Sequence, residues 1–398
     1  FPSVSAAWRI SHEKFMQGSS AWLDNLKLRA SYGSLGNNAT TSYYMYRSLF
    51  ATAGYVLNGS IAGGFAQAVL SNPNLSWEKT CMANIGLDAS LFNSRLSASF
   101  DIYRKLTKGI LISLPAPLEH GTSTVPNQNA GEVCNKGLEV DLQWADRIGS
   151  VSYHAGFNMG FVSNKVTRFQ GDVASINGVY KTQEGHPIDQ LYVITVDRIV
   201  RDQADLDYVQ SLVDANPDYF ATYQRPELGD FLFADTNHDG KLDADDRVEI
   251  GHGATPRLTY GISLGASWRG IDFSALFQGV GDHSVYYNNQ AFRFVTVMGQ
   301  SLVKDITDNA WTPENPYNSI YPILRNNANG KNNIASDAFI QNAAYYRCKN
   351  IQLGYTVPQS VSRRFFVENL RVYTSIDNLF TITSFPGFDP EIGANVGY

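Results

Sequence analysis

Apolar and polar residues alternate without a break in Leu258-Thr259-Tyr260-Gly261-Ile262-Ser263-Leu264-Gly265-Ala266-Ser267-Trp268. A period of two residues predicts a β-strand with one apolar and one polar face. The apolar positions are mostly bulky, whereas the polar positions hold only serine, threonine and glycine. This pattern favours the wall of a transmembrane β-barrel, with its apolar face toward lipid and its polar face toward a lumen. A strand of a soluble β-sandwich alternates in the same way, so the neighbouring segments are needed to distinguish the two folds.

Nine further segments alternate in the same way, so the sequence predicts about ten strands. They are centred on residues 4–10, 26–32, 83–89, 96–102, 138–144, 151–159, 271–277, 351–355 and 370–376. Short turns are expected at 92–94, 146–147, 269–270 and 359–364, and the longest insertions at 163–255 and 281–344. Short periplasmic turns opposite long extracellular loops are typical of outer-membrane barrels, whereas a sandwich more often has comparable loops at both ends.

The alternation also assigns each strand residue to a face. We expect Ala89, Phe100, Leu142, Phe157, Leu264 and Phe277 to face lipid. We expect Asp88, Asp101, Glu139, Asn158 and Gln278 to face the lumen.

Composition and net charge exclude several classes of structure and partner. No apolar run is long enough for a transmembrane helix, and a mean hydropathy of −0.22 is compatible with alternating strands. The net charge of −6 and the lack of a basic cluster argue against a nucleic-acid partner. Three widely separated cysteines, Cys81, Cys134 and Cys348, argue against a disulfide framework, and we interpret them as small apolar fillers.

Seven blocks of sequence occur in a specific order and spacing. They are Phe1–Arg9, Leu26–Gly33, Asn72–Thr80, Asn135–Glu139, Asp235–Gly240, Arg347–Tyr355 and Gly387–Glu391. With these blocks the chain resembles the C-terminal part of SusC/RagA-type TonB-dependent outer-membrane transporters, along nearly all of its length.

The resemblance implies an all-β chain that forms part of a large plugged barrel of about 22 strands. Residues 1–398 would supply the C-terminal portion, with about ten antiparallel strands and long extracellular loops. The plug, the first half of the barrel and the last strand would lie outside this sequence. Such proteins sit in outer-membrane lipid and import oligosaccharides or peptides beneath a SusD-like surface lipoprotein. The TonB complex drives them through the N-terminal part, and we expect oligosaccharides as the first substrate class here.

The segment 235–246, inside the longest insertion, fits the calcium-loop template. The expected ligands are side-chain oxygens and one backbone carbonyl, that of Lys241. The full set is Asp235, Asn237, Asp239, Lys241, Asp243 and Asp246. A glycine at the sixth position, Gly240, allows the sharp turn. Asp246 stands where a longer glutamate is usual, and an Asx-rich turn without metal is the alternative. We expect a structural Ca²⁺ rather than a catalytic one.

Aromatic and amide residues in the loops are candidates for substrate binding, because sugars stack on rings and hydrogen-bond to amides. The candidates are Tyr43, Tyr44, Tyr46, Tyr286, Tyr287, Asn288 and Trp311. Ordinary loop packing or contact with a lid is the alternative for each of them.

We predict no catalytic residues and no enzyme. Gly261-Ile262-Ser263-Leu264-Gly265 matches the G-x-S-x-G nucleophile elbow, but that motif needs a strand-to-helix turn at the serine. Here the alternation continues through Ser263 to Trp268.

A second hypothesis is a soluble, secreted, calcium-dependent carbohydrate-binding β-protein. The bulky strand face discriminates the two, because a second sheet would cover it in a soluble sandwich and lipid would cover it in a barrel.

Overall fold

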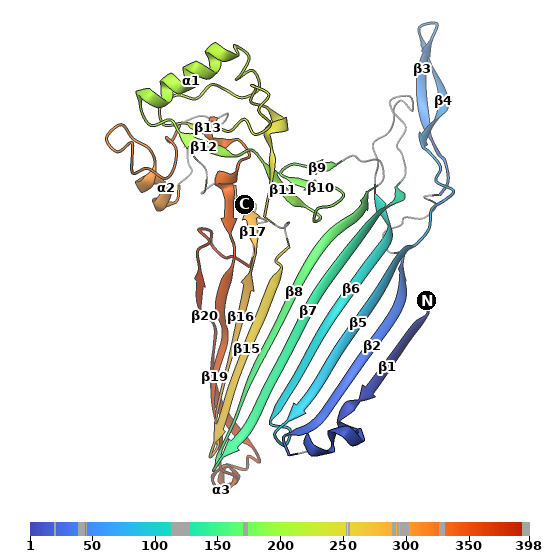
Figure 1. Ribbon diagram of the computed structural model, residues 1–398, viewed down its shortest axis with the longest axis vertical. Coiled ribbons are helices and arrows are strands. Elements are labelled where there is room, and N and C mark those ends of the chain that lie inside the picture. The colour runs from blue at the N-terminus through green and yellow to red at the C-terminus, as the bar shows by residue number, and fades with distance from the viewer. Residues whose placement is uncertain are drawn as a thin grey trace.

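The computed structural model describes residues 1–19, 21–38, 44, 46–112, 127–169, 174–251, 253, 255–288, 292, 294, 302–325 and 331–391. Ten strands form one antiparallel sheet (Figure 1). In spatial order they are β1 (Ser3–Arg9), β2 (Leu23–Asn37), β5 (Glu78–Leu91), β6 (Leu96–Ile112), β7 (Gln128–Ile148), β8 (Val151–Phe169), β15 (Leu258–Trp268), β16 (Ile271–Gly281), β19 (Tyr345–Val357) and β20 (Leu370–Thr383). All ten predicted strands are confirmed, and spatial order follows chain order.

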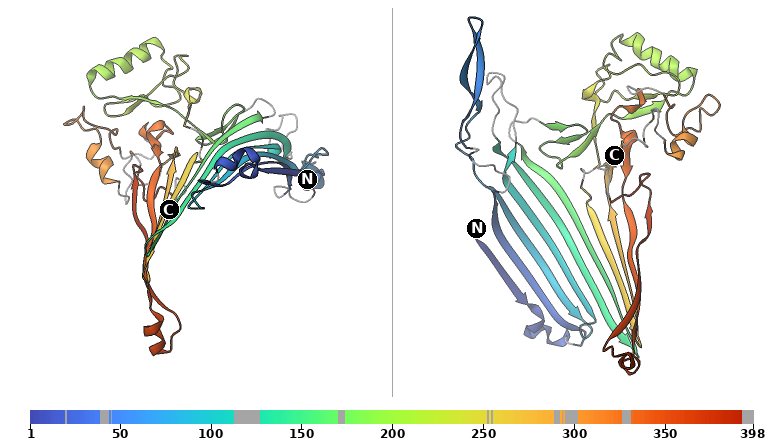
Figure 2. Two further views of the ribbon diagram at one scale, coloured as in Figure 1. Left: turned by 60° about the horizontal axis from the view of Figure 1, so that its bottom comes forward. Right: turned by 180° about the vertical axis from the view of Figure 1, so that it is seen from behind.

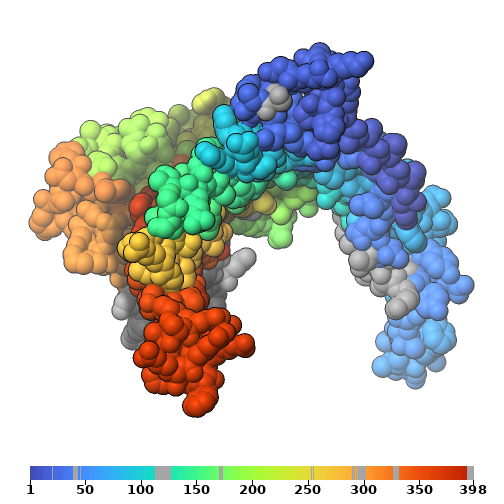
Figure 3. Space-filling view, turned by 90° about the horizontal axis from the view of Figure 1, so that it is seen from below, coloured from blue at the N-terminus to red at the C-terminus, as the bar shows by residue number. Residues whose placement is uncertain are grey.

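The sheet curves like a section of a barrel wall (Figures 2 and 3). It is not closed, because β1 and β20 stand at its two edges and do not pair with each other. The space-filling view along the strands shows this wall as an arc.

Register separates the two faces as the alternation predicts. One continuous cross-strand row is apolar, and it contains Ala98, Leu142, Phe157, Ile262 and Phe277. The adjacent row is polar or small, and it contains Ser99, Asp141, Asn158, Gly261 and Gln278.

The apolar face is exposed in this structure. Ile85 and Ile102, for example, are 61% and 65% exposed. A soluble sandwich would cover such side chains with a second sheet, whereas a barrel leaves them to lipid. Among the described helices, none combines the length and the apolar character needed to cross a membrane.

Short turns close the strands at one end. The turn before β6 uses positive φ at three successive residues, Phe92, Asn93 and Ser94. The turn between β15 and β16 uses Arg269 and Gly270, both with positive φ, and the last turn holds α3 (Gln359–Ser362) and the 3-10 helix η7 (Arg363–Phe365).

The turn expected at 146–147 is displaced. Strand β7 continues to Ile148, and the chain reverses just beyond it because Gly149 takes a positive φ of 60°. Glycine adopts this conformation at little cost.

Long loops fill the other end (Figure 1). The connection from β2 to β5 contains a hairpin of β3 (Leu49–Leu57) and β4 (Ser60–Val69). The loop between β8 and β15 holds β9 (Ser175–Asn177), β10 (Tyr180–Thr182), β11 (Gln190–Val193), β12 (Val196–Ile199), α1 (Gln203–Ala215), β13 (Phe231–Phe233) and β14 (Val248–Ile250). The loop between β16 and β19 holds β17 (Ser284–Tyr286), α2 (Lys304–Asn309) and β18 (Ile340–Asn342). The remaining 3-10 helices are η1 (Ile10–His12), η2 (Lys14–Ser19), η4 (Ala244–Asp246), η5 (Lys331–Asn333) and η6 (Asp337–Phe339).

The longest insertion begins later than residue 163. Strand β8 continues to Phe169, where it still pairs with Gly131 of β7. Ser163 and Lys165 are polar residues at positions of the apolar face, so the alternation stops there although the ladder continues.

The main buried core lies in the long loops. It is rich in aromatic rings, among them Phe231, Phe292, Phe294 and Phe339. The rings of Phe294 and Phe339 lie 5.0 Å apart, and Phe231 meets Phe294 edge-on at 5.5 Å. Two loops that are distant in sequence therefore share one core.

The three cysteines are free. Cys134 and Cys348 are buried, as expected for apolar fillers, and Cys81 is half-buried. Ser263 lies inside β15, opposite Gly156 and Leu276, so the strand provides no elbow at this serine.

Replacing Leu264 with arginine would place a charge on the apolar face near the middle of β15. We expect the free energy of unfolding of the full-length protein in lipid vesicles to fall by about 2–4 kcal/mol. Asn158→Arg, on the polar face of the adjacent strand, is the control and should cost less. Denaturant titration measures both variants, and equal losses would contradict the face assignment.

Candidate functional site

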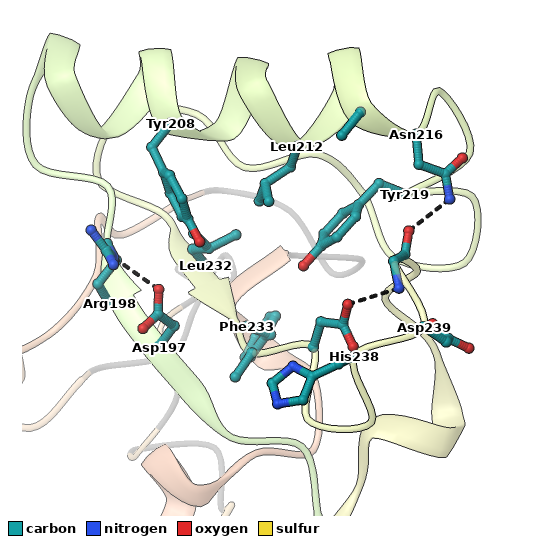
Figure 4. Close-up of a pocket in the computed structure, with 14 residues that line it drawn as sticks. Asp197, Arg198, Tyr208, Leu212, Asn216, Tyr219, Leu232, Phe233, His238 and Asp239 are labelled. Carbon is teal, nitrogen blue, oxygen red and sulfur yellow. Dashed lines mark hydrogen bonds and ion pairs between the residues drawn. The ribbon is translucent and has the colours of Figure 1, made fainter.

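A pocket of about 670 Å³ opens in the loop assembly beside α1 (Figure 4). Helix α1 begins at Asp202, whose side chain accepts a hydrogen bond from the Asp205 N–H as an N-cap. Tyr208 and Leu212 are four residues apart, so they share the helix face that lines the pocket. Antiparallel pairing of β12 with β13 brings the opposite side of the pocket into place.

The pocket combines an apolar floor with polar groups. Leu232 and Phe233 are buried at its base, and the hydroxyls of Tyr208 and Tyr219 point into it (Figure 4). Burial, reinforced by the carboxylate of Asp235, raises the pKa of Tyr219 to about 12. Tyr219 therefore remains a neutral hydroxyl at physiological pH.

An arginine covers one of these rings. The guanidinium of Arg198 lies 4.8 Å from the ring centroid of Tyr208 and donates to Asp197 at 2.8 Å. The residues of this pocket come from separate stretches between 197 and 240 that no short motif joins, so the sequence did not predict it.

The candidate calcium loop forms one wall of the same pocket. Asp246 is fully buried, and its carboxylate accepts hydrogen bonds from the N–H groups of Thr236 and Asp243 at 2.8 and 2.9 Å. Asp235 accepts from the Gly240 N–H at 3.0 Å through Oδ2. Its other oxygen, Oδ1, is buried and has no hydrogen-bond partner among the described residues.

The remaining predicted ligands hold the turns of the loop. The side chains of Asn237, Asp239 and Asp243 each accept a backbone N–H two residues further on, at 2.8 to 2.9 Å. Gly240 has a φ of 77°, as a glycine at the sharp turn requires. The loop follows strand β13 rather than a helix.

Metal binding by this loop stays a prediction. Within the described ranges, no three or more His, Cys, Asp or Glu side chains form a group that could hold a metal ion. The donor set is nevertheless one of hard oxygens, which suits Ca²⁺, and the partnerless Oδ1 of Asp235 is the atom that a cation would satisfy.

The predicted substrate residues do not gather in one place. Tyr43 lies outside the described residues. Tyr44 and Tyr46 are exposed, and the guanidinium of Arg47 lies over both rings, at 5.7 and 5.4 Å.

The other candidates belong to the loop core or border it. Tyr287 and Trp311 are each 5% exposed, so as folded here neither ring offers a face to a ligand. Tyr286 packs edge-on against Phe339, and the Asn288 amide donates to the Tyr286 hydroxyl at 3.2 Å. Burial of a loop aromatic depends on tertiary packing, which the local sequence does not reveal.

The polar face of the wall carries an ion-pair network. Arg29 of β2 pairs with Asp88 of β5 at 3.1 Å, and also with Asp101 of β6. The Ser99 hydroxyl accepts from Arg29 at 3.1 Å and donates to Asp88 at 3.0 Å. Three neighbouring strands therefore share one charge network on the predicted lumen side.

A second network fastens the segment after β20 to the wall. Arg347 of β19 is buried and binds Asp389 and Glu391, each at 2.6 Å. Burial alone would raise the pKa of Asp389, but the hydrogen bonds from Arg347 and from the Glu391 N–H hold it below its ordinary value. We call this network the Arg347 clamp.

The Arg347 clamp joins two of the sequence blocks, Arg347–Tyr355 and Gly387–Glu391. Phe385, just before the second block, packs against Tyr287 of the loop core with ring centroids 4.8 Å apart. The end of the described chain is thus tied both to the wall and to the loops.

A third network joins the two long loops. Asp230 is fully buried and receives two hydrogen bonds from Arg325, at 2.7 and 2.9 Å, and one from Asn332 at 3.1 Å. The hydrogen bonds to Asp230 raise the pKa of Arg325, so its charge is maintained.

Comparison with known proteins agrees with this architecture. The family model described as TonB dependent receptor-like, beta-barrel, matches residues 1–379. This chain belongs to that family. TonB-dependent receptors are β-barrel proteins of the bacterial outer membrane, which confirms the expected location and fold.

Individual relatives agree as well. TonB-dependent receptor P26 of Formosa agariphila is 30% identical over 398 residues, which cover 100% of this chain and 39% of that receptor. TonB-dependent receptor SusC of Bacteroides thetaiotaomicron is 27% identical, over 100% of this chain and 38% of SusC. The chain therefore spans about two fifths of the length of these curated relatives.

Among solved structures, that of the RagAB peptide transporter matches with a TM-score of 0.78 and 28% identity. The match covers 99% of this chain and 41% of that one. The expected resemblance to SusC/RagA-type transporters is confirmed.

Replacing Arg347 with glutamine should release the segment after β20. We expect a loss of about 3–5 kcal/mol in unfolding free energy, because breaking a buried ion pair leaves uncompensated charge. Hydrogen exchange of residues 385–391 in the full-length protein should speed up markedly. Lys349→Gln removes a more exposed partner of Glu391 and serves as the control. Unchanged exchange in Arg347→Gln would show that the clamp does not hold this segment.

The calcium prediction is tested by titrating the metal-stripped full-length protein with Ca²⁺ in a calorimeter. We expect one site with a dissociation constant of about 10⁻⁴ to 10⁻³ M, as in extracellular modules. Asp235→Asn should weaken binding. Asp214→Asn, an exposed carboxylate on α1, should not. Equal affinity in both variants would reduce the motif to a turn.

Proposed function

We propose that the full-length protein imports nutrient oligomers across the bacterial outer membrane, and that this chain forms part of its barrel wall. Membership of the TonB-dependent receptor family carries the proposal. The wall supports it, because a polar face lined with paired charges suits a lumen that holds water or a plug.

The proposed partners follow from the relatives. SusC and RagAB suggest a SusD-like surface lipoprotein as a lid, with energy supplied by the TonB complex through a part of the protein outside this sequence. The loop assembly is suited to meet a lid, because its shared core and the Asp230–Arg325 pair give it a defined surface.

Oligosaccharides are the substrate class that we favour. The observation behind this choice is the pocket beside α1, where the Tyr208 and Tyr219 hydroxyls lie with Asn216 and Asp239 around an apolar floor. Aromatic side chains beside hydrogen-bonding groups suit sugar rings and their hydroxyls. Peptides are the second candidate, because the RagAB relative is a peptide transporter.

We also propose a structural role for Ca²⁺ in the loop 235–246. The cation would satisfy the partnerless Oδ1 of Asp235 and offset the mutual repulsion of the surrounding carboxylates. It would thereby fix the wall of the pocket formed by His238 and Asp239.

Uptake by cells tests the proposal. Deleting the full-length gene should abolish growth on oligosaccharides as the sole carbon source, and leave growth on peptides unchanged. The opposite result would favour the peptide alternative, and unchanged growth on both would overturn the import proposal.

A point variant tests the pocket separately. Tyr208→Ala should raise the half-saturating oligosaccharide concentration about fivefold, as expected for the loss of one aromatic contact. Tyr55→Ala, an exposed tyrosine in the β3–β4 hairpin, is the control and should leave uptake unchanged.

A further inference from the structure

The turn end of the wall carries an unusual concentration of arginine beside large apolar side chains. Three successive strand connections, β7–β8, β15–β16 and β19–β20, carry four arginines in or next to the turn: Arg147 at the end of β7, Arg269, Arg363 and Arg364. All four are exposed, and none makes an ion pair with any of the described residues. Their concentration contrasts with the net charge of −6 of the whole chain.

The three turns form one continuous surface. The Trp268 indole N–H donates to the Ser150 hydroxyl at 3.0 Å, which joins the first turn to the second. The Thr356 N–H donates to the Gly270 carbonyl at 2.7 Å, which joins the second to the third. The Arg269 guanidinium lies 5.5 Å from the Trp268 ring.

The third turn presents two adjacent phenylalanines to solvent. Phe365 is 70% exposed and Phe366 is fully exposed. Phe366 also has a φ of 60°, a left-handed conformation that is uncommon for a bulky residue. The turn protrudes below the strand ends (Figures 1 and 2). Two exposed aromatic rings in a strained turn are unfavourable in water.

The turn that carries these phenylalanines begins where the apolar face of the wall ends. The last pairs on that face are Tyr355 with Val372 and Val357 with Leu370, and the turn begins directly after them. Exposed apolar side chains thus continue along the chain from this face into the turn, to Phe365 and Phe366. Exposed arginines border it, and the one acidic residue of the turn is Glu368.

We propose that this surface, made of the three turns, binds anionic phospholipid. The rings of Phe365 and Phe366 enter the boundary between headgroups and acyl chains, where aromatic side chains are favoured. The arginines bind the lipid phosphates, for which the planar guanidinium provides paired donors. Free phosphate would satisfy the arginines but would leave the phenylalanines in water, so the occupant is a lipid.

The proposal rests on the membrane-spanning fold and not on the imported substrate. Loss of lipid binding therefore leaves the import proposal untouched, and a failed uptake assay leaves the lipid site untouched.

Lipid retention by the full-length receptor in detergent micelles tests the proposal. Native mass spectrometry would compare phosphatidylglycerol with phosphatidylcholine of the same chain length. Each surface arginine contributes about a fivefold gain in affinity for anionic lipid. We therefore expect Arg363→Gln/Arg364→Gln to weaken phosphatidylglycerol binding about 25-fold, with little change for phosphatidylcholine. Arg225→Gln, an exposed arginine in the long loop after α1, should change neither.

A second variant tests the apolar part of the surface. Phe365→Ser/Phe366→Ser should lower retention of both lipids while the receptor keeps its heat-modifiable gel mobility, which reports a folded barrel. If the arginine double variant fails to fold, Arg269→Gln provides the same comparison with about a fivefold effect. If the phenylalanine double variant fails to fold, Phe365→Ser alone replaces it.

Three results would overturn the proposal. One is unchanged phosphatidylglycerol affinity in the arginine variants. Another is displacement of phosphatidylglycerol by equimolar inorganic phosphate, which would indicate a simple anion site. The third is a phenylalanine variant that retains both lipids but unfolds at a lower temperature in lipid-free micelles, which would show that the turn packs against the rest of the receptor.

Discussion

Backbone hydrogen bonding is the constraint on which the rest of this structure depends. Within a bilayer no water can pair with a free N–H or C=O group, so each strand must pair along its length with its neighbours. The longest ladder meets this demand, because β7 and β8 pair from Gly131 and Phe169 down to Ile148 and Val151. Pairing fixes the register, and a fixed register assigns every residue to one face. The alternation of side chains is a consequence of the same constraint.

Wall and loops are stabilised by different means. The wall exposes its apolar face, so lipid takes the place of a protein core there. The loops contain the main core, and two buried ion pairs, Asp230–Arg325 and Arg347–Asp389, connect them to one another and to the wall. Buried ion pairs often add little net stability, and we infer that here they favour one arrangement of the segments they join. At the loop end they fix which segments meet, which the apolar core alone does not.

The sequence predicted the wall well and the loop end poorly. Strand β15 could be located to the residue, because a period of two is a local property and Trp268 and Arg269-Gly270 mark its end. The pocket and the Arg347 clamp depend on partners far apart in sequence, and no local pattern reveals them. Trp311 shows the same limit, because an aromatic residue in a polar stretch can be a binding platform or a core residue, and only packing decides between them.

The difference between the wall and the loop end also explains how a low sequence identity accompanies a closely similar backbone. The chain shares only 28% of its residues with the RagAB structure, yet the TM-score is 0.78. A ladder held by backbone bonds tolerates any side chain that keeps the apolar–polar alternation, so most wall positions are free to change within their class. Positions are more constrained where a side chain connects segments that are distant in sequence. We expect Arg347 and its acidic partners to be such positions, because losing one side of the clamp would leave the other charge unpaired. Loop residues can then vary over a frame that stays fixed, so we expect functional specificity to lie at the loop end.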